Sequence, residues 1–100
     1  HADEGNADAQ VQFGDQYRDG EMGLKKSLKR AFQLFERAAT QGNFRGQVQL
    51  GECYRLGNGV KINNKTAAGW YQRAAEQGYP LAQSHLGWMH YEGKGVAQSH

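Results

Sequence analysis

The sequence has a single cysteine and a single proline among its 100 residues. One cysteine excludes an intramolecular disulfide and any metal site built from several thiols. The sequence also lacks an apolar run of about 18 residues, the length that a membrane-spanning helix needs, so we expect no membrane insertion. Cys53 falls within a predicted helix, and a small buried residue is a simpler interpretation than a reactive thiol.

The common motifs of catalysis and cofactor binding are absent as well. There is no Ser-x-x-Lys, no His-Glu-x-x-His and no phosphate-binding Gly-x-x-x-x-Gly-Lys-Ser/Thr motif. His85 and His90 are roughly 500° apart around a helix and do not share a face. The glycine-rich segments 57–60 and 93–96 follow predicted helices rather than strands, which argues against phosphate loops. We therefore expect no catalysis, no cofactor and no metal ion, although side chains distant in the sequence can meet in a fold.

Charge of one sign does not dominate, because the formal net charge is only +2. Acidic residues prevail in residues 1–21, however, and basic residues prevail in residues 24–45. Neighbouring helices with complementary charged faces would explain this distribution, and a basic docking patch is the alternative. The basic residues form no continuous stripe, so no nucleic acid is expected as a partner. Weak binding of an anionic polymer stays open as an alternative function.

Glycine, in contrast, is abundant and recurs at a fixed period. Gly42 and Gly78 are 36 residues apart, and each stands in a corner of the form Ala-Ala-x-x-Gly. A second set, Gly14, Gly51 and Gly87, is spaced by 37 and then by 36 residues. Several registers that agree this closely indicate stacked supersecondary units. In such a stack each unit contacts only its neighbours, which accommodates a hydrophobic content of only 38%.

Apolar residues at helical spacing predict five helices in an all-α fold. Their expected ranges are about 7–19, 28–40, 44–56, 64–77 and 80–91. Gly20 is expected to end the first helix, Ser27 and Asn63 to cap the second and fourth, and Pro80 to fit the first turn of the fifth. These helices form one repeat array over residues 1–100, with repeat one at about 6–42, repeat two at 43–78 and an incomplete repeat three at 79–100.

Both ends of the chain are expected to be cut from a longer array. Residues 2–5 align with the corner at residues 75–78, and the sequence stops before the second helix of the third unit. Leu86 and Met89 should then be partly exposed or covered by a neighbouring molecule. Self-association through the uncapped ends is a second expected route of contact, because repeat arrays need polar capping units.

Glycines also recur inside the first helix of each unit, although glycine costs roughly 1 kcal/mol against alanine there. These glycines are Gly14, Gly51 and Gly87. Each is expected to mark a site where a helix or a large ring presses on the backbone. Tyr17 and Tyr54 are candidates for bridging the helices of a pair, and Gly69 is a further candidate for close helix approach.

The second unit resembles the Sel-one-like repeat, a relative of the tetratricopeptide repeat. The resemblance rests on Leu50, Gly51, Tyr54, Gly57, Gly59, Val60, Ala67, Trp70, Tyr71, Ala74, Ala75 and Gly78. It covers nearly the whole chain, although His90 replaces the tyrosine in the third unit. The resemblance implies a right-handed α/α solenoid, or superhelix, of antiparallel helix pairs. It also implies an adaptor that holds proteins or peptides on a concave face lined mostly by the first helix of each pair. Many such proteins are bacterial and a good number work in the cell envelope, so the resemblance slightly favours the bacterial periplasm or envelope over the cytoplasm.

The candidate partner-binding residues occupy matching positions, at i, i+3 and i+6, on the first helices. They are Gln12, Asp15, Arg18, Gln49, Glu52, Arg55, His85, Trp88 and Tyr91. The first two trios are polar, whereas the third is aromatic and suits a binding anchor. Packing of the aromatic trio against further chain is the alternative. We therefore predict a non-catalytic protein–protein interaction scaffold, with a regulatory or accessory module of an enzyme as the alternative.

Overall fold

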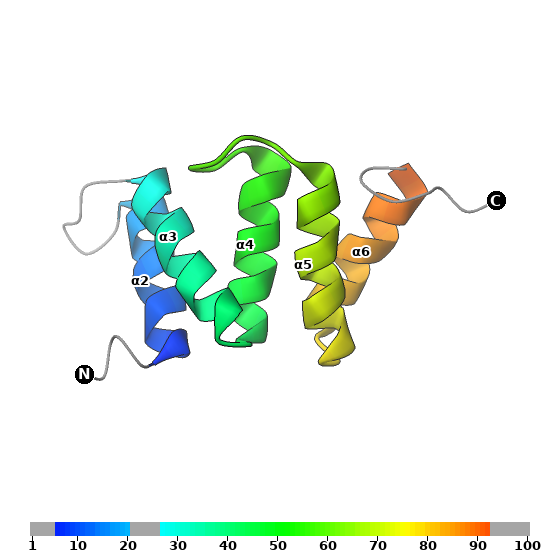
Figure 1. Ribbon diagram of the computed structural model, residues 1–100, viewed down its shortest axis with the longest axis horizontal. Helices are drawn as coiled ribbons and strands as arrows, with labels where there is room; N and C mark the ends of the chain where they lie inside the picture. Colours follow the sequence, from blue (N-terminus) through cyan, green and yellow to red (C-terminus); the bar gives the residue numbers. More distant parts are fainter. Residues whose placement is uncertain (1–5, 21–26, 93–100) are drawn as a thin grey trace.

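The computed structural model describes residues 6–20 and 27–92, and these two ranges contain five α-helices and no strand. The helices are α2 (Ala7–Asp19), α3 (Leu28–Thr40), α4 (Phe44–Leu56), α5 (Asn64–Glu76) and α6 (Pro80–Glu92). Figure 1 shows them side by side in a row, alternately running up and down. The predicted all-α class is confirmed. The predicted bounds are correct except that α5 ends one residue earlier and α6 one residue later.

Four of these helices begin with a side-chain N-cap. The side-chain oxygens of Asn6, Ser27, Asn43 and Asn63 each accept a hydrogen bond from an amide three residues further on, at 2.9 to 3.2 Å. Such caps satisfy amide groups that have no partner inside the helix. Ser27 and Asn63 confirm the prediction, whereas Asn6 and Asn43 were not predicted. Pro80 is the first residue of α6, as expected.

Two kinds of connection alternate along the chain. The first helix of each complete pair ends at a left-handed glycine, Gly20 with φ 71° and Gly57 with φ 78°. This conformation suits glycine because it lacks a Cβ. The second helix ends at the alanine corner, and the glycines there, Gly42 and Gly78, have φ values of 89° and 85°. The recurring corner of the sequence is therefore a recurring turn of the structure.

The buried side chains form two clusters that share one helix. The first cluster, between α2, α3 and α4, consists of Val11, Ala31, Phe35, Ala38, Ala39, Leu50 and Cys53. The second, between α4, α5 and α6, consists of Val48, Ala67, Ala68, Tyr71, Ala74, Ala82 and Met89. Helix α4 contributes to both clusters, and α2 packs directly on α4 as well as on α3. This is the nearest-neighbour core of a solenoid, and the predicted stack of antiparallel helix pairs is confirmed.

Large rings press on two of the helix glycines, as predicted. A Cβ placed on Gly14 would lie 2.5 Å from Cε1 of Phe35, and one on Gly51 would lie 2.9 Å from Cε1 of Tyr71. Both rings belong to the second helix of the same pair. The small residue thus lets each helix pair close around a buried aromatic ring.

Two of the expectations about glycine are wrong, and the tyrosines differ in what they contact. No atom within 4 Å would meet a Cβ on Gly87 or on Gly69, so neither marks a close approach in the described part of the chain. Tyr54 packs against the second cluster, which contains the buried residues of α5, and also edge-on against Phe32 of the preceding pair, with ring centroids 5.6 Å apart. Its counterpart Tyr17 does lie within its own pair, beneath the guanidinium of Arg30.

The expectation for the last helix is also wrong for one residue. Met89 is 0% exposed, whereas Leu86 is partly buried. Helix α6 packs on α5, and this contact carries Met89 into the second cluster within the chain itself. The loop predicted at residues 93–96 and the aligned residues 2–5 lie outside the described residues.

Candidate functional site

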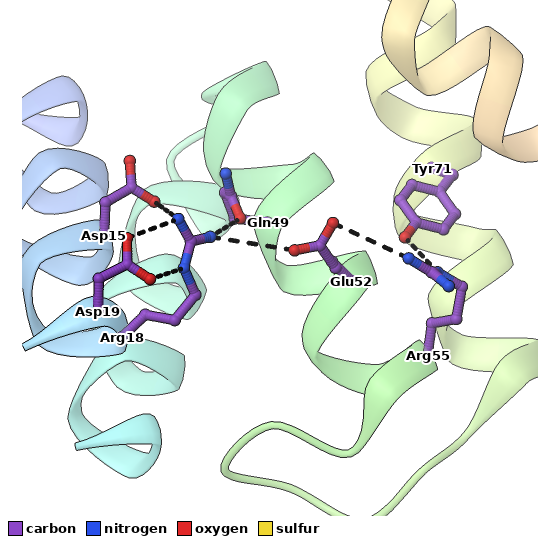
Figure 2. Close-up of polar contacts among 7 residues, drawn as sticks. All are labelled: Asp15, Arg18, Asp19, Gln49, Glu52, Arg55 and Tyr71. Atoms are coloured by element: carbon purple, nitrogen blue, oxygen red, sulfur yellow. Dashed lines mark hydrogen bonds and ion pairs between the residues drawn. The ribbon is translucent and has the colours of Figure 1, made fainter. Parts of the chain in front are cut away.

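The nine predicted binding residues lie in threes on α2, α4 and α6, and we call the face that carries them the first-helix surface. Gln12, Trp88 and Tyr91 are exposed, and Tyr91 is 75% exposed. The other six are partly buried. Figure 2 shows five of them, together with the neighbours Asp19 and Tyr71, linked across α2, α4 and α5.

Arg18 joins the first two helices of this surface. Its Nη1 donates a hydrogen bond of 2.8 Å to Oε1 of Gln49 on α4 and lies 3.9 Å from Oε1 of Glu52. On its own helix, Nη2 lies 3.2 Å from Oδ1 of Asp15, and Nε lies 3.2 Å from Oδ1 of Asp19 (Figure 2). One guanidinium therefore fixes the spacing of α2 and α4 at this surface.

The charge of Arg18 is secured by these partners. Burial by itself lowers the pKa of Arg18. The hydrogen bond to Asp19 and the negative charges of Asp15, Asp19 and Glu52 together raise it by more, so the net pKa is raised. The guanidinium stays charged at every physiological pH. Arg18 thus acts as a fixed positive centre surrounded by acidic groups.

Arg55 continues the row toward the third helix. Its Nη2 lies 3.9 Å from Oε2 of Glu52, and its Nε donates a hydrogen bond of 3.3 Å to the hydroxyl of Tyr71. Its guanidinium carbon lies 5.6 Å from the centre of the Trp88 ring, within reach of a cation–π contact. Glu52 therefore lies between two arginines, and the second of them contacts the aromatic end of the surface (Figure 2).

His85 reaches this row through Tyr71. The two rings are stacked with centroids 4.9 Å apart and an angle of 11° between their planes. Burial lowers the pKa of His85, the positive charge of Arg55 lowers it further, and Glu52 opposes them in part. The imidazole is therefore held in its neutral form at neutral pH, which suits a stacking role.

A hollow of about 400 Å³ opens at the α2 end of the surface. It is lined by Asn6, Asp8, Ala9, Val11, Gln12, Asp15 and Arg45. Gln12 and Asp15 thus share a concavity with Asp8, which accepts a hydrogen bond of 2.8 Å from Asn43. Two carboxylates and one arginine give the hollow a mainly acidic lining.

The contacts therefore bring most of the predicted residues together. The row of ion pairs, hydrogen bonds and ring contacts joins Asp15, Arg18, Gln49, Glu52, Arg55 and Trp88 directly. His85 joins it through Tyr71, and Gln12 joins it through the hollow that it shares with Asp15. Tyr91 lies in the last turn of α6 and is the most exposed of the aromatic trio.

Two features near the surface were not predicted. Tyr71 was expected only as an apolar helix residue, yet it links Arg55 to His85. A second feature is a repeated glutamine contact: the exposed Gln41 donates a hydrogen bond to the buried Gln10 at 2.8 Å, and the exposed Gln77 donates one to the buried Gln47 at 2.9 Å. Each amide pair joins the first helix of a unit to the end of the second helix of the same unit, and the 36- and 37-residue spacing of the four glutamines could have identified them.

Acid–base and metal chemistry have few candidates in the described residues. Burial, with a smaller contribution from Glu52, raises the pKa of the Cys53 thiol to about 12, although Arg18 opposes this shift. A thiol with so high a pKa is a poor nucleophile. In residues 6–20 and 27–92, no cluster of three or more His, Cys, Asp or Glu side chains is placed to hold a metal ion. No helix in this part of the chain has the length and apolar character of a membrane span.

The geometry of stacked helix pairs matches a known repeat along the chain. The sequence profile of the Sel1 repeat matches residues 7–43, 45–79 and 80–100. The chain belongs to the Sel1 repeat family. Proteins built from Sel1 repeats form non-catalytic helical scaffolds in general and typically mediate protein–protein interactions. The resemblance seen in the sequence is confirmed.

Similar proteins come from distant organisms. Protein sel-1 homolog 2 of Rattus norvegicus is 41% identical over 78 residues, which is 77% of this chain and 11% of the rat protein. The ERAD-associated E3 ubiquitin-protein ligase component HRD3A of Arabidopsis thaliana is 35% identical over 72 residues, 72% of this chain and 11% of that protein. The crystal structure of a protective antigen from uropathogenic Escherichia coli strains, with an SLR fold, superposes with a TM-score of 0.92. It is 40% identical and covers 98% of this chain, which spans 21% of the antigen. This Sel1 chain thus spans only a small share of each relative.

Proposed function

We propose that this Sel1 chain is a non-catalytic scaffold that binds a protein or peptide on its first-helix surface, the concave side of the solenoid. The observation that carries the proposal is the row that runs from Arg18 through Glu52 to Arg55 and ends at Trp88. Its side chains are held by one another before any ligand arrives. Binding to such a surface loses less conformational entropy than binding to mobile side chains.

The two ends of the surface favour different ligand groups. Trp88 is 42% exposed and supplies a large ring for an apolar side chain. The hollow at the other end carries the carboxylates of Asp8 and Asp15 and suits a lysine or arginine side chain. Between them Arg18 and Arg55 alternate with acidic partners. An extended or helical peptide with a basic residue near one end and an apolar residue near the other fits this order.

The experiment is a selection of peptides from a randomised display library on the immobilised chain. The selected peptides are then measured against Trp88→Ala and Glu52→Ala, each checked for folding by circular dichroism. Loss of a buried aromatic anchor costs about 2 kcal/mol, so Trp88→Ala should weaken binding roughly thirtyfold. Glu52→Ala should change the association rate and its salt dependence more than the affinity.

A matched control is Trp70→Ala, which removes the other tryptophan, on α5, outside this surface. It should leave unchanged the affinity of those selected peptides whose binding depends on Trp88. Peptides that bind Trp88→Ala and Glu52→Ala as tightly as the parent would place the binding site elsewhere. Self-association through the chain ends is a second proposal, and sedimentation of the unliganded chain over a range of concentrations tests it.

An accessory role beside an enzyme is a second candidate function. It is favoured by the Arabidopsis relative, whose name describes a component of a ubiquitin-protein ligase. In this role the same surface would hold the enzyme rather than a free peptide. Cross-linking from a photoreactive residue at position 88 of the natural protein, followed by mass spectrometry, distinguishes the two by the identity of the captured chain.

A further inference from the structure

The second helices carry two hollows at the same position of the repeat. The hollow on α3, of about 200 Å³, is lined by Tyr17, Arg30, Gln33, Leu34 and Arg37. The hollow on α5, of about 210 Å³, is lined by Thr66, Gly69, Trp70 and Arg73. The α5 residues follow their α3 counterparts by 36 residues, the period that separates Gly42 from Gly78. We call these two sites the second-helix hollows.

Each hollow pairs an apolar side chain with arginine at helical spacing. In α3 the residues are Leu34 and Arg37, and in α5 they are Trp70 and Arg73, so the arginine lies one turn beyond the apolar group in both. Gly69 leaves the α5 hollow open, because no atom lies within 4 Å of a Cβ placed there. Each volume lies below the roughly 300 to 1,000 Å³ of small-molecule sites and suits a single side chain.

The electrostatics of the hollows differ from those of the first-helix surface. No carboxylate lines either hollow. The guanidinium carbon of Arg30 lies 5.7 Å from the centre of the Tyr17 ring, and that of Arg73 lies 4.5 Å from the centre of the Trp70 ring. Within the described residues, Arg30, Arg37 and Arg73 form no ion pair. The guanidinium groups therefore offer hydrogen-bond donors that an incoming carboxylate could use.

We propose that the second-helix hollows form a second binding surface for an acidic segment of a partner protein, in which carboxylate side chains flank an apolar side chain. The apolar group enters a hollow beside Leu34 or Trp70, and the carboxylates meet Arg37 or Arg73. A nucleic acid fits less well. Arg73 already covers one face of the Trp70 ring, and Glu36 and Glu76 interrupt the basic residues of the same helices.

The test uses a fluorescein-labelled peptide in which a leucine is flanked on both sides by glutamates. Its anisotropy is measured with the parent chain and with the double variant Arg37→Gln and Arg73→Gln. The matched control is Lys29→Gln with Lys65→Gln, which removes the same charge from the same two helices but outside the hollows. The arginine variant should weaken the peptide about tenfold, and the lysine variant less than about twofold.

Two further peptides separate a specific site from general attraction. Replacing the glutamates by glutamines, or the leucine by serine, should each reduce binding at constant salt. In two-dimensional NMR spectra of the parent chain, the amide of Gly69 should shift on peptide addition, whereas the amide of Gly51 should not. A leucine-free peptide that binds as tightly as the original would overturn the proposal, and so would equal weakening by the lysine and arginine variants.

The remaining outcomes assign the surface to another ligand. Binding of the peptide that is lost in Trp88→Ala would place it on the first-helix surface and overturn the proposal. A heparin fragment or DNA duplex that binds more tightly than the peptide, with the same dependence on Arg37 and Arg73, would also overturn it. A dimer that dissociates in the arginine variant would identify a second copy of this chain as the occupant instead. Since Trp88 is unchanged in the arginine variant, failure here leaves the proposed function of the first-helix surface intact.

Discussion

The two helices of the second repeat, α4 and α5, have the same length of 13 residues but lie in different surroundings. Helix α4 packs on α2, α3 and α5, whereas α5 packs on α4 and α6. Accordingly α4 contributes Leu50 and Cys53 to the first buried cluster and Val48 to the second, while the fully buried residues of α5 all belong to the second. A helix with neighbours on several sides leaves little room for change at any of its positions.

The same residue types therefore have opposite roles in the two helices. Gly51 of α4 lies against the ring of Tyr71, whereas Gly69 of α5 has open space in front of it. Arg55 of α4 has a carboxylate, a hydroxyl and an aromatic ring as partners, whereas Arg73 of α5 contacts one ring. A repeat sequence thus specifies where a residue lies in the stack, and the neighbouring layer decides what the residue does.

The largest expected difference concerns the two glycines. We expect Gly51→Val to destabilise the fold by about 3 kcal/mol, because its Cβ would lie 2.9 Å from the Tyr71 ring and 3.2 Å from the carbonyl oxygen of Ala67. Gly69→Val, the control, should change stability by less than about 0.5 kcal/mol, since valine and glycine have similar helix propensities. Urea denaturation followed by circular dichroism measures both. Equal losses in the two variants would show that contact with Tyr71 is not what constrains position 51.

The next effect arises from the buried thiol of α4. Cys53 has a pKa of about 12 in the fold, mainly because of burial, against 9.0 as its ordinary value. The unfolded chain therefore loses this proton first as the pH rises. The stability that the buried thiol contributes is complete below the ordinary value and is lost as the pH rises toward the folded value.

At about pH 10.5 this loss amounts to roughly 2 kcal/mol, since each pKa unit corresponds to about 1.4 kcal/mol. Urea denaturation at pH 8 and 10.5 measures it, and Cys53→Ala is the control. The stability of the variant should decline less between the two pH values. The decline that remains includes the contribution of Tyr71, whose pKa is raised chiefly by burial. An identical pH dependence in parent and variant would contradict the raised pKa of the thiol.

A third effect has the opposite sign. Gly69→Ala should stabilise the chain by about 1 kcal/mol, because alanine is the better helix former and nothing lies within 4 Å of the added methyl group. The matched change in α4, Gly51→Ala, should destabilise the chain, since the Tyr71 ring must move. Thermal unfolding of both variants provides the comparison. A lower melting temperature for Gly69→Ala would mean that the outer side of α5 is more crowded than the structure indicates.

Much of the fold could be predicted because its signals are local and repeated. The alanine corners, the N-caps Ser27 and Asn63 and the terminal glycines each specify a turn within a few residues. The period then places equivalent helices in equivalent positions. The division into repeats at residues 42 and 78 stays a prediction, since the structure describes a continuous stack.

For the candidate site, the sequence predicted only which residues share one face of each first helix. Helical spacing places Asp15 and Arg18 on one face of α2 and Glu52 on one face of α4, but it does not say which side chains meet between helices. The contact of Arg18 with Gln49 depends on the offset between α2 and α4. The role of Tyr71 could not be anticipated either, because a residue predicted as core presents its hydroxyl to Arg55. The packing of neighbouring layers supplies this information, and the sequence pattern does not.

The smallest expected difference concerns the two arginines. Arg55→Gln should destabilise the chain by about 1 kcal/mol, because the Tyr71 hydroxyl loses a hydrogen-bond donor and Glu52 loses an ion pair. Arg73→Gln should cost less than about 0.5 kcal/mol, since it removes only an exposed contact with Trp70. Urea denaturation at low and at high salt distinguishes the two variants. The loss of stability caused by Arg55→Gln should depend more strongly on salt than the loss caused by Arg73→Gln.

A second readout distinguishes electrostatics from packing. The charge of Arg55 contributes, after burial, to the lowered pKa of His85, so Arg55→Gln should raise that pKa toward its ordinary value of 6.5. Arg73→Gln should leave it unchanged. Titration of the His85 ring protons by NMR measures both variants. Since the lowered pKa costs stability as the pH falls below 6.5, Arg55→Gln should also make the chain less sensitive to mild acid. An unchanged pKa of His85 in Arg55→Gln would mean that burial alone sets it, and that the charged row does not reach the third helix.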